Sequence, residues 1–365
     1  MKKVPFNDLS RIHEPIHKKV FAKFSKVVQE NRFVLNKEIG EFECLFSEFT
    51  ESKYTVSCAS GTDALELILR ALEIGKNDEV ILPTNTFIAT ALAVTRCGAM
   101  PVFVDNDEFY LIDTKQVEKK ITKKTKAIIA VNLYGQIANI KKLKQIADKY
   151  KIYLIQDSAQ SHGATSSYDH NKLSIASAYS FYPGKNLGAW GDAGAVTTNN
   201  KKLSLKIKAI SNQGGIKKYE HSYIGGNSRM DALQACVLNE KLKHIKSWNK
   251  QRNKIADIYL AELSDNKKIV LPKKFENNYH VWHLFVIRVK NRNNVLKKME
   301  DDGIMCGIHY PKLISNQKFL KGHTQYKNKF TNASAYEKNI ISLPIYPGMS
   351  QKQALLVCKS LDKIA

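Results

Sequence analysis

The most informative part of the chain is the stretch SFYPGKNLGAWGDAGA, residues 180–195. Four of the eighteen glycines lie between residues 184 and 194, and they surround a single lysine, Lys185. Glycines allow the backbone of a loop to come close to a bound ligand. A lysine in a partly dry pocket loses its proton more easily and can attack a carbonyl group. The alternative is a glycine-rich turn with a solvated lysine, because lysines are abundant throughout this chain.

Short apolar segments alternate with amphipathic helical segments on both sides of this stretch, from about residue 54 to 210. The expected strands are residues 54–57, 80–83, 101–104, 127–131, 153–156, 178–181 and 195–198. Between the first two, Leu65, Ile68, Leu69 and Leu72 recur at helical spacing behind Ser60, a suitable N-cap. This alternation predicts an α/β layer with a largely parallel, buried sheet. Ligands of such sheets bind at the carboxyl ends of the strands.

A second, smaller α/β unit is expected in the C-terminal part of the chain. Residues 229–263 have the pattern of one long helix or two successive helices, and a less regular linker follows. The smaller unit should contain strands at residues 280–289 and 304–310, a helix near 294–301, and a last helix opened by a capping box of Ser350 and Gln353. We therefore expect two domains, residues 1–250 and 251–365.

The formal charge of +23 raises the question of nucleic-acid or membrane partners. Lysines outnumber arginines about sixfold, whereas phosphate and guanine recognition favours the arginine fork. We therefore expect neither partner, although a basic, non-catalytic nucleic-acid-binding protein stays the alternative from another functional class. The charge would also help to attract an anionic small substrate. Six widely spaced cysteines, the absence of a zinc-ligand spacing and the lack of a long apolar run favour a metal-free cytoplasmic protein.

Three further motifs fall at expected strand ends or loops. Gly61 and Thr62 follow Ser60 at a turn into a helix, where free N–H groups suit a phosphate, or where Ser60 simply caps the helix. Asp157 ends an apolar strand and could pair with a protonated ring nitrogen, or it could form a capping box with Gln160. Phe87 could stack on a planar ring or belong to the core.

Together these motifs resemble the DegT/DnrJ/EryC1/StrS family of sugar aminotransferases, and the likeness covers nearly the whole chain. It is carried by residues 60–65, 157–164, the Lys185 loop and residues 227–229. The resemblance implies the aspartate aminotransferase-like fold (fold type I), with a large domain around a mostly parallel sheet and a smaller C-terminal α/β domain. It also implies the cofactor pyridoxal 5'-phosphate, pyridoxamine phosphate as its aminated form, and a homodimer with active sites at the subunit interface.

The resemblance assigns a role to each matching residue. Lys185 would form the Schiff base with pyridoxal phosphate, and Asp157 would pair with the pyridinium nitrogen. The other expected cofactor contacts are Gln160 at the ring hydroxyl, Phe87 at the ring face, and Gly61, Thr62, Ser180 and Asn227 of the partner subunit at the phosphate. The expected substrate contacts are His309, Tyr310, Tyr182, Tyr219 and Arg229.

The resemblance also suggests the reaction. One branch of the family carries out dehydration with a histidine in place of the lysine, so the intact Lys185 favours transamination. L-Glutamate would be the amino donor. Residues 4–9 and 181–185 are similar to enzymes that aminate C3 of dTDP-3-keto-6-deoxyhexoses, and a UDP-linked 4-keto sugar is the alternative acceptor.

Overall fold

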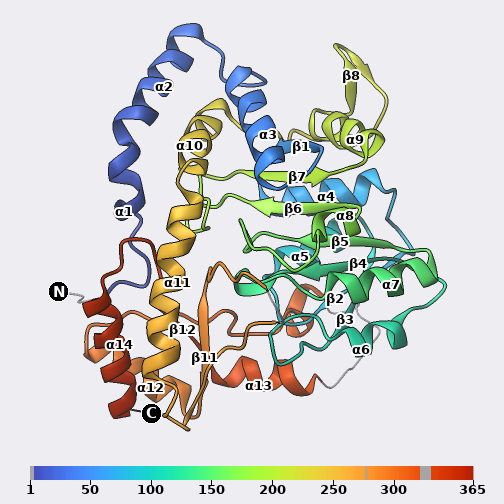
Figure 1. The fold of residues 1–365 in the computed structure, drawn as a ribbon. Coiled ribbons are helices and arrows are strands. Elements are labelled where there is room, and N and C mark those ends of the chain that lie inside the picture. Colours follow the sequence, from blue (N-terminus) through green and yellow to red (C-terminus); the bar gives the residue numbers. More distant parts are fainter. Residues whose placement is uncertain (1–3, 276–277, 321–329, 365) are drawn as a thin grey trace.

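The fold is built on a central β-sheet that runs through the first half of the chain (Figure 1). The structure is a computed structural model and describes residues 4–275, 278–320 and 330–364. Within these ranges the sheet has seven strands in the order β1-β7-β6-β5-β4-β2-β3, and only β7 runs antiparallel to its neighbours. The strands are β1 (Tyr54–Cys58), β2 (Glu79–Pro83), β3 (Met100–Val104), β4 (Thr125–Val131), β5 (Tyr153–Asp157), β6 (Ala176–Ser180) and β7 (Gly194–Thr198). All seven predicted strands are confirmed, with small differences at their ends.

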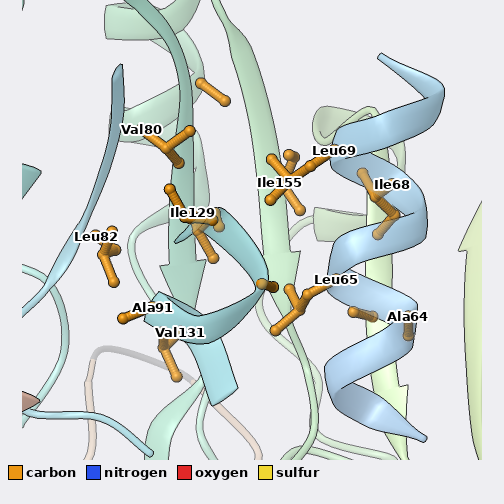
Figure 2. Packing of buried hydrophobic residues seen from close by; sticks show 14 of the residues in the cluster. Ala64, Leu65, Ile68, Leu69, Val80, Leu82, Ala91, Ile129, Val131 and Ile155 are labelled. Atoms are coloured by element: carbon orange, nitrogen blue, oxygen red, sulfur yellow. The ribbon is translucent and has the colours of Figure 1, made fainter. Parts of the chain in front are cut away.

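One face of the sheet is covered by helix α4 (Gly61–Ala71), whose apolar side packs onto the strands. Figure 2 shows Leu65 and Leu69 of this helix pointing toward Ile155 of β5. Burying each such side chain contributes about 1.5–3 kcal/mol. The predicted N-cap is confirmed, because the Ser60 hydroxyl accepts a 3.1 Å hydrogen bond from the backbone N–H of Asp63.

The opposite face of the sheet is covered by α7 (Ile140–Tyr150), which buries Leu143 and Ile146. Neighbouring side chains of β4 point to opposite faces of the sheet. Ile128 packs in the cluster beneath α7, and Ile129 packs in the cluster beneath α4. Burial on both faces explains why these strands are apolar along their whole length, as is usual for parallel sheets.

A second, antiparallel sheet lies in the C-terminal part of the chain. Its strands, in the order β10-β11-β12, are β10 (Ile269–Val270), β11 (Phe285–Val289) and β12 (Ile340–Leu343). Helices α12 (Arg292–Asp301) and α14 (Gln351–Ile364) bury their apolar residues in the same core as this sheet. The predicted capping box of α14 is confirmed: the Gln353 N–H donates to the Ser350 hydroxyl at 3.2 Å, and the Ser350 N–H donates to the Gln353 carboxamide oxygen at 3.0 Å.

Two strand predictions in this second unit are wrong in extent or kind. The strand expected at 280–289 begins only at Phe285, because the N–H groups of Val281 and Leu284 donate to the carbonyls of Gly135 and Tyr134 instead of to a neighbouring strand. The segment 304–310 has isolated bridges at Ile304 and Gly307 and no regular strand. Apolar alternation indicates which side chains are buried, but not which neighbouring segment forms the backbone hydrogen bonds. The edge strand β12 is a further strand that the sequence did not predict.

Two consecutive helices, α10 (Ala232–Leu242) and α11 (Ile245–Glu262), lead from the large sheet to the small one (Figure 1). The expected domain boundary at residue 250 lies inside α11 and stays a prediction. Helix α2 (His17–Glu30) packs on α10. The remaining helices and strands are α1 (Ser10–His13), η1 (Glu14–Ile16), α3 (Lys37–Phe49), α5 (Ala89–Arg96), α6 (Thr114–Val117), η2 (Glu118–Lys120), η3 (Leu133–Gly135), α8 (His170–Leu173), α9 (Lys201–Ser211), β8 (Gly215–Lys217), β9 (Glu220–His221), η4 (Ile314–Asn316), η5 (Lys318–Leu320) and α13 (Thr331–Asn339).

Candidate active site

A cavity of about 610 Å³ lies where strands β4, β5 and β6 end, the position expected for the ligand of a parallel sheet. Both sheets contribute to it, since residues before β11 and after β12 complete its wall. Ten of the predicted site residues line this one cavity: Gly61, Thr62, Phe87, Asp157, Gln160, Ser180, Tyr182, Lys185, His309 and Tyr310.

Lys185 lies in the loop that follows β6, with its side chain half-buried in the cavity wall. Its backbone N–H donates a 2.9 Å hydrogen bond to the Tyr182 carbonyl, which closes a tight turn. Burial lowers the pKa of the Lys185 amine to about 8, and the Asp157 carboxylate opposes that shift. A substantial fraction of the amine is therefore neutral near pH 7–8, and only the neutral amine can act as a nucleophile or a base.

Asp157 ends β5 and is buried beneath the cavity. The Thr90 hydroxyl donates a 2.8 Å hydrogen bond to Oδ2, and the backbone N–H of Ala159 donates a 3.2 Å hydrogen bond to Oδ1. Burial raises the pKa of Asp157, while Thr90, Ala159 and Lys185 act in the opposite direction. No helix follows Asp157, so the alternative of a capping box with Gln160 is wrong.

The turn before α4 forms a second wall. The tight packing there depends on Gly61, because a Cβ at this position would lie 2.5 Å from the Ser180 Cβ. The first N–H groups of a helix have no partner within the helix, and the helix dipole adds a partial positive charge at this end. Gly61, Thr62 and Ser180 thus surround a position that suits an anion.

Aromatic side chains from distant parts of the sequence face the cavity. Phe87 is 49% exposed, so it is not a core residue, and its ring centroid lies 5.5 Å from that of Tyr310. His309 stacks on Phe6 and shares a 2.8 Å hydrogen bond between its Nδ1 and the Ser342 hydroxyl. Burial and the charge of Lys185 lower the pKa of His309 to about 4, so its imidazole is neutral.

Gln160 connects these aromatic residues to the sheet. Its carboxamide nitrogen donates a 2.9 Å hydrogen bond to the Tyr310 hydroxyl. Its oxygen accepts a 2.7 Å hydrogen bond from the backbone N–H of Tyr134. Both ends of the carboxamide therefore have protein partners, and the expected contact of Gln160 with a ring hydroxyl stays a prediction.

The cavity also contains residues that the sequence did not reveal. Arg252 and His283 line it, and both are far from any motif along the chain. Phe6 and Asn7 line it from the N-terminal block that supported the resemblance, so that block was a usable signal. Thr90, the partner of Asp157, is one turn beyond Phe87 on a helix that gave no separate signal.

Similarity to known proteins identifies the family of this chain. The model of the DegT/DnrJ/EryC1/StrS aminotransferase family matches residues 14–362. The chain belongs to this family. It is 38% identical to a Streptomyces venezuelae dTDP-3-amino-3,4,6-trideoxy-alpha-D-glucose transaminase, over 100% of this chain and 96% of that one. It is 40% identical to a dTDP-3-amino-3,6-dideoxy-alpha-D-galactopyranose transaminase of Aneurinibacillus thermoaerophilus, over 99% of both chains.

Solved structures confirm the aspartate aminotransferase-like fold of the aminotransferase. S. venezuelae DesV, solved in complex with a ketimine intermediate, superposes with a TM-score of 0.96 at 36% identity, over 100% of this chain and 98% of that one. A Bacillus subtilis protein solved with bound pyridoxamine phosphate gives a TM-score of 0.94 at 32% identity, over 100% and 85% of the two chains. Family membership makes the chain an enzyme, and it replaces the hypothesis of a non-catalytic nucleic-acid-binding protein.

Enzymes of this family use pyridoxal 5'-phosphate, and the residues of this aminotransferase fit that cofactor. The helix N-terminus beside Gly61 suits its phosphate, and the half-exposed Phe87 offers an aromatic face to its ring. Asp157 offers a buried carboxylate for the ring nitrogen, and Lys185 offers an amine of low pKa for the aldehyde.

Three predicted site residues do not line the cavity of this single chain. Tyr219 is 84% exposed on the turn of the β8–β9 hairpin. Arg229 donates a 2.9 Å hydrogen bond to Asn212 and lines a different cavity, beside α3 and α9. Asn227 forms an isolated bridge with Asn212. This position of Asn227 is compatible with its expected contribution to a partner subunit, which stays a prediction.

The glycines around Lys185 have a different purpose from the one expected. A Cβ on Gly188 would lie 2.3 Å from the Pro183 carbonyl oxygen, and a Cβ on Gly194 would lie 2.3 Å from the carbonyl of Ser60. A Cβ on Gly191 would meet the Gln234 side chain. These three glycines therefore allow close approach of the protein to itself. The expectation that the loop glycines make room for a ligand is wrong for these positions.

The cysteines and the possible membrane and metal sites can be described briefly. All six cysteines are unpaired; Cys58, Cys236 and Cys358 are buried and Cys44 is exposed. Across the described ranges, no helix combines the length and the apolar character that crossing a membrane requires. No cluster of histidine, cysteine, aspartate or glutamate side chains suited to a metal ion occurs in the part of the chain that the structure describes.

Proposed function

We propose that the enzyme transfers the amino group of L-glutamate to the C3 keto group of a dTDP-linked 6-deoxyhexose. The observation that carries the proposal is the placement of Lys185 and Asp157 in one cavity, with the N-terminal turn of α4 beside them. The choice of acceptor is supported by the two relatives above, both named as dTDP-3-amino-sugar transaminases and both similar over the whole chain.

The residues of the cavity have different proposed roles. Bound pyridoxal phosphate supplies the electron sink on which amino transfer depends. Gly61, Thr62 and Ser180 would hold its phosphate, and Asp157 would hold the positive charge of its ring nitrogen. The neutral amine of Lys185 acts as the general base that removes the proton from the donor Cα. Its lowered pKa makes this possible near neutral pH, because an ordinary lysine would be almost entirely protonated there.

We also propose that the enzyme is a cytoplasmic homodimer in which Asn227 of one subunit completes the phosphate site of the other. Three large side chains around the β8–β9 hairpin are unusually exposed for a monomer: Ile216 at 63%, Tyr219 at 84% and Ile224 at 89%. Large exposed side chains so close together along the chain are a common feature of interfaces. Sedimentation should give a dimer for the wild type, and Ile224→Asp should shift it toward the monomer. The unpaired cysteines support a reducing compartment.

The direct test is a panel of dTDP- and UDP-linked 3-keto and 4-keto sugars, each incubated with the purified enzyme and L-glutamate. We expect one dTDP-3-keto-6-deoxyhexose to be converted fastest, and NMR of the product should place nitrogen on C3. Nitrogen on C4 of a UDP-linked sugar would favour the alternative acceptor and overturn this assignment. Conversion of no sugar in the panel would overturn the proposed substrate class.

A further inference from the structure

His283 lines the cavity but has no part in the functions assigned so far. It lies in the segment between α11 and β11 and is half-buried. Its imidazole is close enough to Lys185, Arg252 and His309 for their charges to affect its protonation. A side chain so near the reacting amine has either a purely structural role or a contact with the substrate.

A chain of hydrogen bonds fixes the orientation of the side chains behind His283. The carbonyl of Val281 can only accept, so the Asn186 atom 3.0 Å from it must be the carboxamide nitrogen. The carbonyl of His162 likewise requires the nitrogen of Asn249 at 2.9 Å. The Asn249 oxygen then accepts from the Asn186 nitrogen at 2.9 Å, and both amides are satisfied in this single arrangement.

This arrangement determines the tautomer of His283. The Asn186 oxygen is the atom that lies 3.2 Å from His283 Nδ1, and an amide oxygen has no proton to donate. Nδ1 must therefore carry the proton. Burial and the nearby cations hold the pKa of His283 well below its usual value, so the imidazole is neutral and Nε2 has a free lone pair. Among the residues that the structure describes, Nε2 has no hydrogen-bond partner.

The backbone of His283 is held firmly on both sides. The Arg252 guanidinium donates to the carbonyls of Trp282 at 3.2 Å and of Ile345 at 2.7 Å. Gly135 packs so closely that a Cβ there would lie 2.9 Å from the backbone nitrogen of His283. The imidazole is thus positioned before any substrate arrives, as a specific polar contact in a binding site requires.

We propose that Nε2 of His283 accepts a hydrogen bond from a hydroxyl group of the sugar acceptor. This inference rests on the proposed function, since it needs an acceptor with hydroxyl groups near its keto carbon. The amino donor is a poor partner for this atom, because the lone pairs of its two carboxylates would be repelled and its amino group is the group that is transferred. The neutral ring hydroxyls of a sugar have the proton that the lone pair can accept.

Two substitutions distinguish the role of Nδ1 from that of Nε2. His283→Asn places an amide nitrogen near the position of Nδ1, so it keeps the bond to Asn186 and removes the acceptor in the cavity. His283→Gln reaches the position of Nε2 and can offer an amide oxygen there. His244→Asn, at the turn between α10 and α11 and outside the cavity, is the matched control for a histidine-to-asparagine change.

We expect His283→Asn to raise the KM for the keto sugar by about three- to tenfold, the loss of one hydrogen bond. His283→Gln should recover part of this loss, and His244→Asn should show none of it. Titration calorimetry with a dTDP-6-deoxyhexose that lacks the keto group should show the same ranking without turnover. Acceptor analogues that lack one ring hydroxyl each should identify the partner, because the penalty should disappear for one of them.

Separate measurement of the two half-reactions distinguishes this inference from the proposed function. Addition of glutamate should change the absorbance of the bound cofactor at comparable rates in the wild type and in His283→Asn. An equal slowing of this half-reaction would overturn the assignment of His283 to the acceptor, and so would an unchanged sugar KM in His283→Asn. Failure of the wild type to aminate any sugar would instead count against the proposed function.

Discussion

The ammonium group of Lys241 lies 2.6 Å from the carbonyl oxygen of Gly188, within the loop that carries Lys185. Lys241 comes from α10 and is completely buried. Its Nζ also lies 2.9 Å from Nε2 of His13, in the N-terminal helix α1. A buried lysine thus joins the Lys185 loop to α1 and α10, two helices outside the central sheet. Burying a lysine amine lowers the stability of the fold unless the amine has hydrogen-bond partners. The contacts with Gly188 and His13 supply these partners, and they fix the position of the loop.

Lys241 should make the stability of the enzyme depend on pH. Burial lowers its pKa to about 7 in the folded state, against an ordinary value near 10.5. The unfolded chain therefore binds more protons between about pH 7 and 10.5, so the free energy of unfolding should rise with pH in this window. In Lys241→Met this slope should fall by about 1 kcal/mol per pH unit. Urea denaturation of the holoenzyme at several pH values measures the slope.

Lys246→Met removes an exposed lysine from the next helix and serves as the control for the change in charge. Its slope should match that of the wild type. An identical pH dependence in the wild type and in Lys241→Met would show that the buried amine titrates normally, contrary to the expectation from its burial.

Replacing Lys185 should stop the reaction and leave the fold intact. Lys185→Ala should lower kcat by at least about a thousandfold, because the general base and nucleophile are lost together. Lys185→Arg should be about as inactive, since a guanidinium stays protonated and cannot remove a proton. Steady-state assays with L-glutamate, together with circular dichroism, test both variants. Appreciable transamination by either variant would show that another group serves as the base.

Two substitutions distinguish the role of the Asp157 charge from that of the hydrogen bond that Thr90 donates to it. Asp157→Asn should cost at least about a hundredfold in kcat, because it removes the negative charge opposite the cofactor ring. Thr90→Val keeps the charge but removes the 2.8 Å hydrogen bond, and should cost roughly tenfold. Thr95→Val is the control on the same helix, since its hydroxyl bonds only to backbone carbonyls. Rates in Asp157→Asn close to those of the wild type would make the carboxylate a structural residue.

The sequence predicted those parts of the molecule that depend on local patterns. The strands of the central sheet are apolar because both of their faces are buried, and this pattern is visible without the fold. Lys185 and Asp157 could also be predicted as site residues, because Asp157 ends such a strand and Lys185 lies in the loop after another. Strand ends mark the ligand site of a parallel sheet.

Other functional features depend on contacts between distant segments. Lys241 has the sequence context of a surface lysine, and its burial follows from His13 and Gly188, more than 50 residues away. His283 gains its fixed tautomer only through Asn186, about a hundred residues earlier in the chain. The glycines of the Lys185 loop indicate that some group approaches the backbone closely. Sequence could not show that the approaching group is the backbone of Ser60 and Pro183 rather than a ligand.

Gly194 provides the last test, because it controls the turn that should bind the phosphate. A Cβ there would lie 2.3 Å from the Ser60 carbonyl and 2.8 Å from the Gly61 backbone nitrogen, and backbone atoms cannot move aside as a flexible side chain can. Gly194→Ala should therefore displace the start of α4. We expect a loss of about 1–3 kcal/mol in the free energy of unfolding and at least roughly tenfold weaker binding of pyridoxal phosphate.

Gly40→Ala is the matched control, since a Cβ at Gly40 in α3 would meet no atom within 4 Å. This variant should bind the cofactor normally and gain up to about 1 kcal/mol, because alanine suits a helix interior better than glycine. Fluorescence titration of the apoenzyme with pyridoxal phosphate and thermal denaturation measure the two effects. Unchanged cofactor affinity in Gly194→Ala would show that the Ser60–Gly61 turn does not bind the cofactor phosphate. The anion site would then have to lie elsewhere in the cavity.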